Sequence, residues 1–234
     1  MSCIEKRFFG VELVPDEGSD LSPHWAEDRS ASAVLVFAGR SLLWRLVRNK
    51  GYRRYFGGGR HYVVPVEPGA SRQIRWATGC PVGPFPEFQT IVRMLSHAES
   101  SGAAVYLLGR STDELQRIEQ NIRVTFPGVR VVGRAVFHPI SIASVTTAIR
   151  KSAPRIVLSS VTSSSFLRWM LVSADRIGPT LTVLTPGGLG RMAGKRRTSI
   201  VMSVLSTPVR LLLPIPLVIH RLVLRRKKKK RVRV

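Results

Sequence analysis

Short apolar runs alternate with amphipathic stretches of helical spacing through most of the chain. The runs predict strands at residues 33–37, 104–108, 129–132, 155–160 and 180–185. Between them, apolar residues recur at intervals of three and four, which is the spacing of a helix that buries one face. Strands that are apolar throughout and alternate with helices are typical of a parallel sheet covered on both faces. The pattern therefore predicts an α/β fold with a mostly parallel sheet and helices on both faces.

The clearest helix signal follows the run at residues 104–108. Ser111 and Glu114 form an S-x-x-E capping box, in which the serine hydroxyl accepts from the glutamate N–H. The buried stripe of this helix is predicted to be Leu115, Ile118, Ile122 and Phe126. A second stripe, at Phe88, Ile91, Val92 and Leu95, predicts a helix that stops at Gly102. Residues 50–82 are rich in Gly, Pro and Arg, and "HYVVPV" within them fits either a short strand or an extended loop.

The predicted strands end in small residues. These are Gly109, Gly133, Ser159 with Ser160, and Gly187 with Gly188 after Pro186. Ligands of open parallel sheets bind beyond the carboxyl ends of the strands, and a helix N-terminus there favours phosphate. Four such ends in series favour a nucleotide cleft over glycines that merely make tight turns. The chain has neither a G-x-G-x-x-G fingerprint nor a P-loop.

Several polar residues are candidates for this cleft. Arg110 directly follows Gly109 and is a candidate diphosphate contact, with a solvated surface residue as the alternative. Ser163 and Ser164 precede a predicted helix, so they fit either phosphate binding or ordinary N-capping. The histidines lack the spacing of a metal site, and no metal or other cofactor is expected. Among them His138 is singled out, because it lies just past the predicted strand end at Gly133.

The composition is that of a globular protein in a reducing compartment. The 234 residues are 44% hydrophobic and 22% charged, which suits one domain with a sizeable core. Cys3 and Cys80 are too few for a disulfide framework, and the start of the chain lacks the apolar stretch of a signal peptide. We expect a protein that faces the cytoplasm.

The net charge of +23 calls for an anionic partner. Eight of the residues 225–234 are cationic, and they follow an apolar segment, 199–224, that prolines, arginines and a histidine interrupt. This pattern favours a segment that lies on an anionic membrane surface over one spanning helix, although the basic run alone also fits a solvated tail. The expected membrane contacts are Arg210, Arg221, Arg225, Arg226, Lys227 and Lys228. Nucleic acid is disfavoured, since there is no recognition motif. The predicted organisation is an α/β domain at 1–198 and a membrane-associating segment at 199–234.

The stretch "VYLLGRSTDELQRIEQNIRVTFPGVRVVG" resembles the bacterial WecG/TagA/CpsF glycosyltransferases, which have a strand ending in LLG, a helix, a YPG-like turn and a strand ending in V-G. The resemblance extends over residues 33–197 and includes "TPGGLGRMAGKRR", which matches a glycine-rich stretch ending in A-G-K. It implies a Rossmann-like fold. It also implies metal-free transfer of an N-acetylhexosamine, typically N-acetylmannosamine, from a UDP-sugar to an undecaprenyl-diphosphate-linked sugar. An arginine-rich C-terminal appendage of the family helps hold the enzyme to the membrane and complete the site.

The chain departs from the family pattern where the chemistry is expected. Ala38 stands where the D-G-x-G motif has its proposed catalytic aspartate. A general base contributes roughly 10²–10⁴ in rate, and alanine cannot act as one. Carboxylates upstream could replace it only if their segment folds over the cleft; these are Asp16, Asp20, Glu27 and Asp28.

Two further departures concern polar residues of the family. Phe166 and Leu167 replace the polar pair of a G-x-P-x-Q-E turn, and the aspartate of the G-G-x-x-D region falls on Gly190 or Arg191.

Two functions follow from the sequence. The first is a glycosyltransferase at the inner face of the bacterial cytoplasmic membrane, with a UDP-sugar and a lipid-linked acceptor as its partners. In it Gly109, Gly133 and residues 187–190 form the nucleotide cleft. The second is a catalytically degenerate relative that serves as a binding or scaffold protein at the membrane. The resemblance favours the first and the lost polar residues favour the second; whether the chain forms a homo-oligomer is left open.

Overall fold

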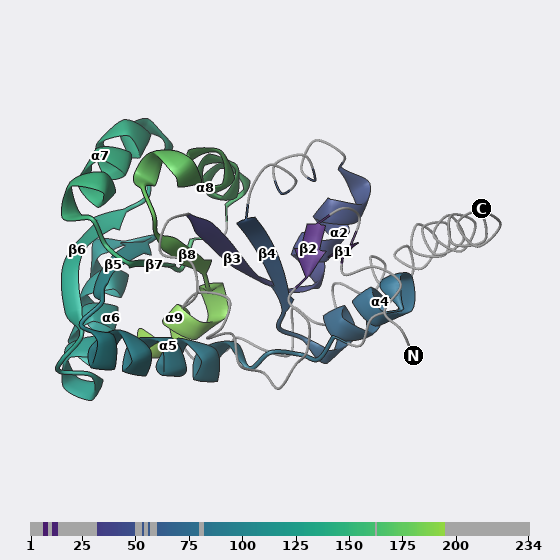
Figure 1. Cartoon of the computed structure of the whole chain (residues 1–234), viewed down its shortest axis with the longest axis horizontal. Coiled ribbons are helices and arrows are strands. Elements are labelled where there is room, and N and C mark those ends of the chain that lie inside the picture. The colour runs from purple at the N-terminus through teal and green to yellow at the C-terminus, as the bar shows by residue number, and fades with distance from the viewer. Residues whose placement is uncertain are drawn as a thin grey trace.

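The computed structural model describes residues 7–8, 11–13, 32–49, 53, 56, 60–79, 82–161 and 163–194. The strands are β1 (Arg7–Phe8), β2 (Val11–Leu13), β3 (Ala33–Ala38), β4 (Arg60–Pro65), β5 (Ala104–Gly109), β6 (Arg130–Val136), β7 (Ile156–Ser159) and β8 (Leu181–Leu184). They form one sheet in the order β1-β2-β4-β3-β8-β7-β5-β6, as Figure 1 shows. The β1–β2 pair is antiparallel and the other neighbouring pairs are parallel, so the predicted mostly parallel sheet is confirmed.

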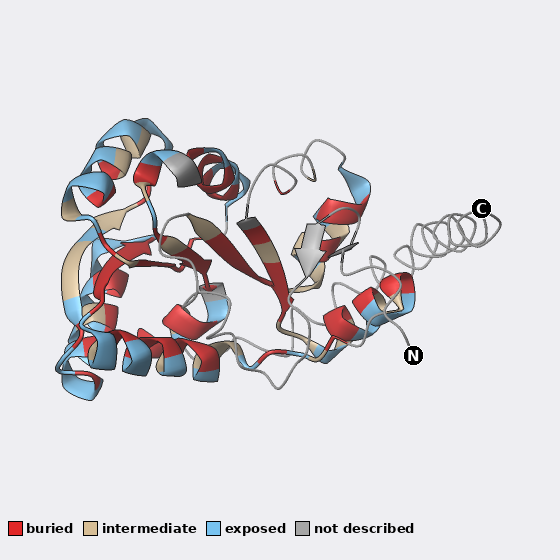
Figure 2. Cartoon of the chain, viewed as in Figure 1, coloured by how far each residue is buried: buried red, intermediate tan, exposed pale blue. Residues whose placement is uncertain are grey.

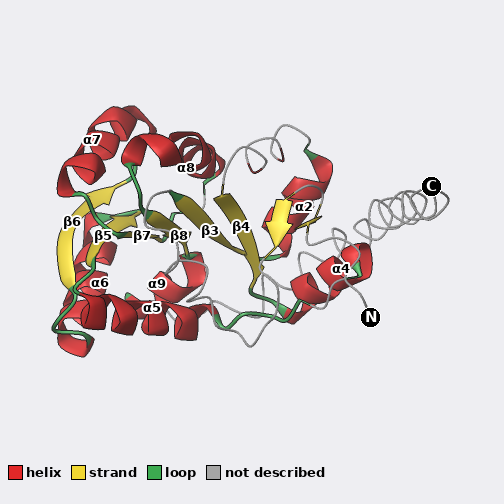
Figure 3. Ribbon diagram, in the orientation of Figure 1, coloured by secondary structure: helices red, strands yellow, loops and turns green. Residues whose placement is uncertain are grey.

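Helices cover both faces of this sheet. They are α2 (Arg40–Arg48), α4 (Pro68–Thr78), α5 (Glu87–Ser101), α6 (Thr112–Thr125), α7 (Ile142–Ser152), α8 (Ser164–Ile177) and α9 (Pro186–Met192), with a 3-10 turn, η1, at Pro139–Ser141. The buried side chains of α2, α4, α7 and α8 join one core cluster with Val34 and Val36 of β3. Those of α5, α6 and α9 join a second cluster with Leu35 and Phe37. Figure 3 shows the strands between the two helical layers, and Figure 2 shows that the central strands are largely buried.

The helix α6 agrees with its prediction in detail. The Ser111 hydroxyl accepts from the Glu114 N–H at 3.3 Å and caps the first turn. Its four predicted core residues, Leu115, Ile118, Ile122 and Phe126, are all buried. The predicted stop of α5 is also confirmed, because Gly102 has the left-handed φ of 65° that suits glycine at a helix end.

The sequence predicted that a strand ends at Gly133, and that prediction was wrong. β6 continues to Val136, and its register with β5 shifts beside Tyr106, which pairs with Gly133. A Cβ on Gly133 would stand 2.5 Å from the Tyr106 ring, so the glycine makes room for a buried aromatic side chain across a bulge. Burial raises the pKa of the Tyr106 hydroxyl, which stays neutral.

Some elements were not predicted. Of the two alternatives for "HYVVPV", the strand is correct, because residues 61–65 belong to β4. The helix α4, which was not predicted, follows it from Pro68 to Thr78 and is capped by Gly79 with a φ of 75°. The seven-residue helix α9 occupies the glycine-rich stretch that the sequence suggested as an open strand end.

Part of the sequence-based prediction falls outside the described residues. This holds for the segment 199–234 with all six proposed membrane contacts, for the upstream carboxylates and for both cysteines. Within the described ranges, no helix combines the length and the hydropathy needed to cross a bilayer.

Candidate active site

The carboxyl ends of β3 and β8 meet at a crevice. These strands are neighbours, but β3 continues into α2 on one face of the sheet, whereas β8 continues into α9 on the other. Ligands of open α/β sheets bind where adjacent connections diverge in this way. A cavity of about 330 Å³ lies here, lined by the ends of β3 and β8, by Val66 and Glu67 after β4, and by parts of α2, α5, α8 and α9.

Glu67 is the first of two carboxylates in this cavity. It lies two residues beyond Pro65, the residue of β4 that pairs with Ala38, and the Val66 N–H donates to the Ala38 carbonyl at 3.2 Å. One carboxylate oxygen lies 3.3 Å from the place where a Cβ on Gly39 would stand. The other lies 3.3 Å from the Arg40 Nε, and the Glu67 side chain is 37% exposed. A carboxylate therefore reaches the end of β3 from the neighbouring strand.

Glu87 is the second carboxylate, and it is held more firmly. One of its oxygens accepts from the Thr185 hydroxyl and from the Gly187 N–H, each at 2.9 Å. Thr185 is fully buried, and Glu87 itself opens α5. The carboxylate thus satisfies a backbone N–H at the start of α9, where the sequence suggested that a diphosphate would bind.

Two side chains of α2 add polar groups to the cavity. Arg45 lines it and donates from Nη1 to the Ser164 hydroxyl at 2.8 Å, which connects α2 with the start of α8. Ser41 also lines it, one turn earlier. The cavity therefore combines two carboxylates with a guanidinium and a hydroxyl.

The family model for the WecG/TagA/CpsF glycosyl transferases matches residues 12–202 of this chain. The chain belongs to this family. A search of curated proteins finds no match at a significant level. The match spans every described strand from β3 onward and all the helices that enclose the cavity.

In this family member, Ala38, which the resemblance aligns with the family aspartate, lies in the core. The Ala38 side chain is fully buried and belongs to the cluster beneath α2 and α8. Of the pair that replaces the polar turn, Leu167 lines the cavity. Phe166 is fully buried and packs on Phe137 and Trp169, with ring centroids 4.7 and 5.4 Å away. Ala38, Phe166 and Leu167 thus belong to one apolar core cluster, which borders the cavity at Leu167.

At most of the glycines proposed from the sequence, a neighbouring side chain fills the space that a ligand would need. Leu115 lies 2.7 Å from a Cβ placed on Gly109, and Ile91 occupies the corresponding space at Gly188. Gly187 lines the cavity, but its N–H bonds Glu87. The idea that these small residues leave room for a diphosphate does not hold at Gly109, Gly133 and Gly188, because they make room for side chains.

The polar residues proposed with them have local partners. Arg110 donates from Nε and Nη2 to the Ser160 carbonyl, at 3.2 and 3.1 Å, and does not line the cavity. Ser163 caps α8 by accepting from the Phe166 N–H at 3.2 Å, which is the capping alternative. His138 Nδ1 accepts from the Ile140 N–H and caps η1. Ser164 accepts from Arg45, which lines the cavity, but Ser164 itself does not line it. Substrate binding by these residues stays a prediction.

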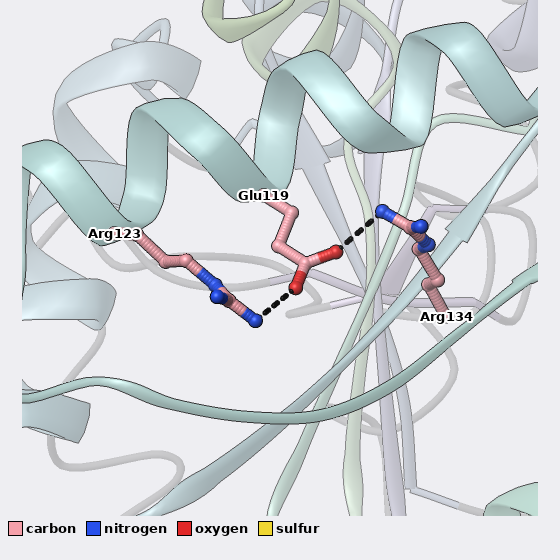
Figure 4. Close-up of polar contacts among 3 residues, drawn as sticks. All are labelled: Glu119, Arg123 and Arg134. Carbon is pink, nitrogen blue, oxygen red and sulfur yellow. Dashed lines mark hydrogen bonds and ion pairs between the residues drawn. The ribbon is translucent and has the colours of Figure 1, made fainter.

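A wider groove of about 630 Å³ lies between α6 and the outer edge of β6. Glu119 crosses it with both carboxylate oxygens bonded, one to Arg123 and one to Arg134, each at 2.6 Å (Figure 4). One carboxylate offsets only one of the two positive charges, so this cluster keeps a net positive charge. The cavity at the carboxyl ends of β3 and β8 is the better candidate site, because it lies where the connections of neighbouring strands leave the sheet on opposite faces.

Sequence reasoning missed both carboxylates of the cavity. Glu67 directly follows residues 61–66, for which the sequence fitted either a strand or a loop. Glu87 follows Pro86, just before the apolar stripe that predicted α5. A carboxylate directly after an apolar run was the available signal for Glu67, because such positions lie at the ligand-binding edge of a parallel sheet.

Proposed function

We propose that this protein is a glycosyltransferase that moves an N-acetylhexosamine from a UDP-sugar to a polyprenyl-diphosphate-linked acceptor at the cytoplasmic face of the bacterial membrane. Family membership supports the class of reaction, with a sugar donor and an acceptor. The observation that carries activity in this particular chain is Glu67, a carboxylate in the cavity beside Gly39, which directly follows Ala38, the residue that the resemblance aligns with the family aspartate.

Glu67 acts as the general base in this proposal. The acceptor hydroxyl oxygen forms a bond to the anomeric carbon of the donor, while the bond from that carbon to the diphosphate oxygen breaks. The hydroxyl proton passes to Glu67, and UDP leaves with the bonding electrons. Arg45, which lines the same cavity, is placed to offset the charge that develops on the leaving diphosphate. The partial exposure of Glu67 suits the role, since an incoming hydroxyl must reach the carboxylate.

A specific observation favours a second candidate, a scaffold that binds but does not turn over. Ala38 is buried, and Phe166 and Leu167 are apolar where the family has polar residues. At about 330 Å³ the cavity is at the small end of the range for ligand sites. In this alternative Glu67 pairs with Arg40 as a surface ion pair and does no chemistry.

Nucleotide binding and turnover distinguish the two candidates. We expect UDP to bind in an isothermal titration, and a UDP-N-acetylhexosamine with a polyprenyl-diphosphate-linked acceptor to release UDP. The matched control titration uses ADP in place of UDP, which tests whether the uracil base is recognised. Binding of UDP without release from the donor would support the scaffold, and absence of both would contradict both candidates.

The segment 199–234 is proposed to hold the protein on the membrane. A variant truncated after residue 198 lacks the eight cationic residues of 225–234. Each surface cation contributes about 1 kcal/mol to binding of an anionic bilayer. We therefore expect the shortened chain to be largely released from vesicles that contain phosphatidylglycerol, measured by co-sedimentation. Unchanged sedimentation would contradict this role. An alkaline carbonate wash of cell membranes separates a surface-bound segment, which is extracted, from a spanning helix, which is not.

A further inference from the structure

The helices α2 and α4 carry exposed basic and aromatic side chains at one end of the sheet. The two helices contact each other, and their buried residues enter the same core cluster. Figure 1 shows both at the end of the sheet where β4 and β2 lie. We use the name α2–α4 surface for Trp44, Arg48, Arg72, Arg75 and Trp76, whose side chains are exposed or partly exposed.

Charge on this part of the chain is one-sided. Between Asp28 and Glu87 the sequence has ten arginines and lysines but one acidic residue, Glu67, which faces the cavity. Neither α2 nor α4 contains an acidic residue. Within the described part of the chain, no acidic side chain pairs with Arg48, Arg72 or Arg75. On the opposite layer, by contrast, Arg123 of α6 is paired with Glu119, as Figure 4 shows.

The tryptophans lie among these arginines. On α4, Trp76 is 38% exposed and follows Arg72 by one helical turn, with Arg75 next to it. On α2, the Arg48 guanidinium lies 4.7 Å from the centre of the Trp44 ring. Tryptophan concentrates at the headgroup level of bilayers, where its ring is amphipathic, and arginine binds phosphate through a planar pair of N–H groups.

We propose that the α2–α4 surface binds the phosphate headgroups of anionic lipids. The contact is made by the folded domain and is separate from the segment 199–234. Tryptophan with arginines that pair with no acidic side chain among the described residues, on helices without a carboxylate, matches that chemistry. A nucleic acid would also complement the positive charge of this surface. It is the less favoured ligand, because the surface has two tryptophans but no nucleic-acid recognition motif.

The helix α2 connects this surface with the cavity. Ser41 and Arg45 line the cavity, whereas Arg48, less than one turn beyond Arg45, lies on the α2–α4 surface. A domain seated on lipid through this surface holds the first turns of α2, and with them one wall of the cavity, close to the headgroup layer. This use for a lipid-linked acceptor rests on the proposed function; the lipid contact itself does not.

The experiment measures binding of the full chain to phosphatidylcholine vesicles with and without phosphatidylglycerol. The test variant is Arg72→Gln/Arg75→Gln/Trp76→Ser. The control, Arg117→Gln/Arg123→Gln/Val124→Ser, removes the same charge from exposed positions of α6 on the other face. We expect the partition coefficient of the test variant to fall about 30-fold or more, from two cations at about 1 kcal/mol each, and that of the control to change much less.

Several outcomes overturn the proposal. They are an equal loss in both variants, no loss in the test variant, or equal binding to neutral vesicles. Displacement of the vesicles by duplex DNA, with a matching loss of DNA binding in the test variant, assigns the surface to nucleic acid instead. Far-ultraviolet circular dichroism checks folding, and Arg48→Gln on α2 gives an independent variant, with a loss of about 5-fold expected. UDP titration of the same variants separates this proposal from the proposed function, since lipid binding can fail while UDP binding persists.

Discussion

Replacing Glu67 with glutamine is expected to lower the rate of sugar transfer by roughly 10²–10⁴-fold, the usual contribution of a general base. Glutamine keeps the size of the side chain but cannot take the proton of the acceptor hydroxyl. Because the carboxylate is 37% exposed and pairs with Arg40 at the surface, its loss should change stability little. The measurement is release of UDP under saturating donor and acceptor, so that kcat and KM are separated. We expect the loss in kcat.

Glu87→Gln is the matched control for Glu67→Gln. Both residues line the cavity, but the Glu87 carboxylate is engaged by the Thr185 hydroxyl and the Gly187 N–H. A glutamine carbonyl can still accept from both groups, but without the negative charge these hydrogen bonds are weaker, so we expect a lower thermal midpoint. The change in kcat should be much smaller than that of Glu67→Gln, because Glu87 is not the general base. If Glu67→Gln keeps full kcat while Glu87→Gln loses it, the base has been assigned to the wrong carboxylate. If neither changes kcat, no carboxylate of the cavity is the base.

The local pattern sufficed for the elements that the sequence predicted well. The α6 helix has its cap, its buried stripe and its end within one short stretch, so each residue reports on the same local structure. Gly133 was misplaced because the reason for it, the ring of Tyr106, is on another strand. A glycine at a bulge and a glycine at a turn look alike in sequence.

The helix α9 shows the opposite limit. A stretch of Pro, Gly, Gly, Leu and Gly has poor helix propensity, since each glycine in a helix costs about 1 kcal/mol relative to alanine. Its support is tertiary: Leu189 and Met192 are buried, and Glu87 accepts the N–H of Gly187 at its first turn. The residues of the stretch itself do not predict these contacts.

The candidate site was the least predictable part for the same reason. The Glu67 carboxylate, which lies beside Gly39 at the end of β3, follows a different strand, and only the pairing of β3 with β4 brings it there. The resemblance predicted that a carboxylate is missing at Ala38, whereas the fold was needed to find Glu67 at the end of the same strand.

Phe166→Ala is expected to reduce the free energy of unfolding by about 3–5 kcal/mol, the usual cost of removing a buried phenylalanine ring. Phe166 is fully buried at the start of α8, and its ring contacts Phe137 edge-on and Trp169 at a tilt. Phe137, which directly follows β6, and Trp169 of α8 also stack on each other, so the loss leaves a cavity beside these two rings. Urea denaturation followed by tryptophan fluorescence measures the change, and the m-value checks that unfolding remains two-state.

Val172→Ala gives the control within the same helix. Val172 is 53% exposed, so its truncation should change stability by less than about 0.5 kcal/mol. A loss below about 1 kcal/mol for Phe166→Ala would mean that the ring does not anchor α8, and the interpretation of this departure as core packing would be wrong. A large loss would give a physical reason why the polar pair of the family cannot simply be restored here, because Phe166→Gln would bury an amide against the rings of Phe137 and Trp169.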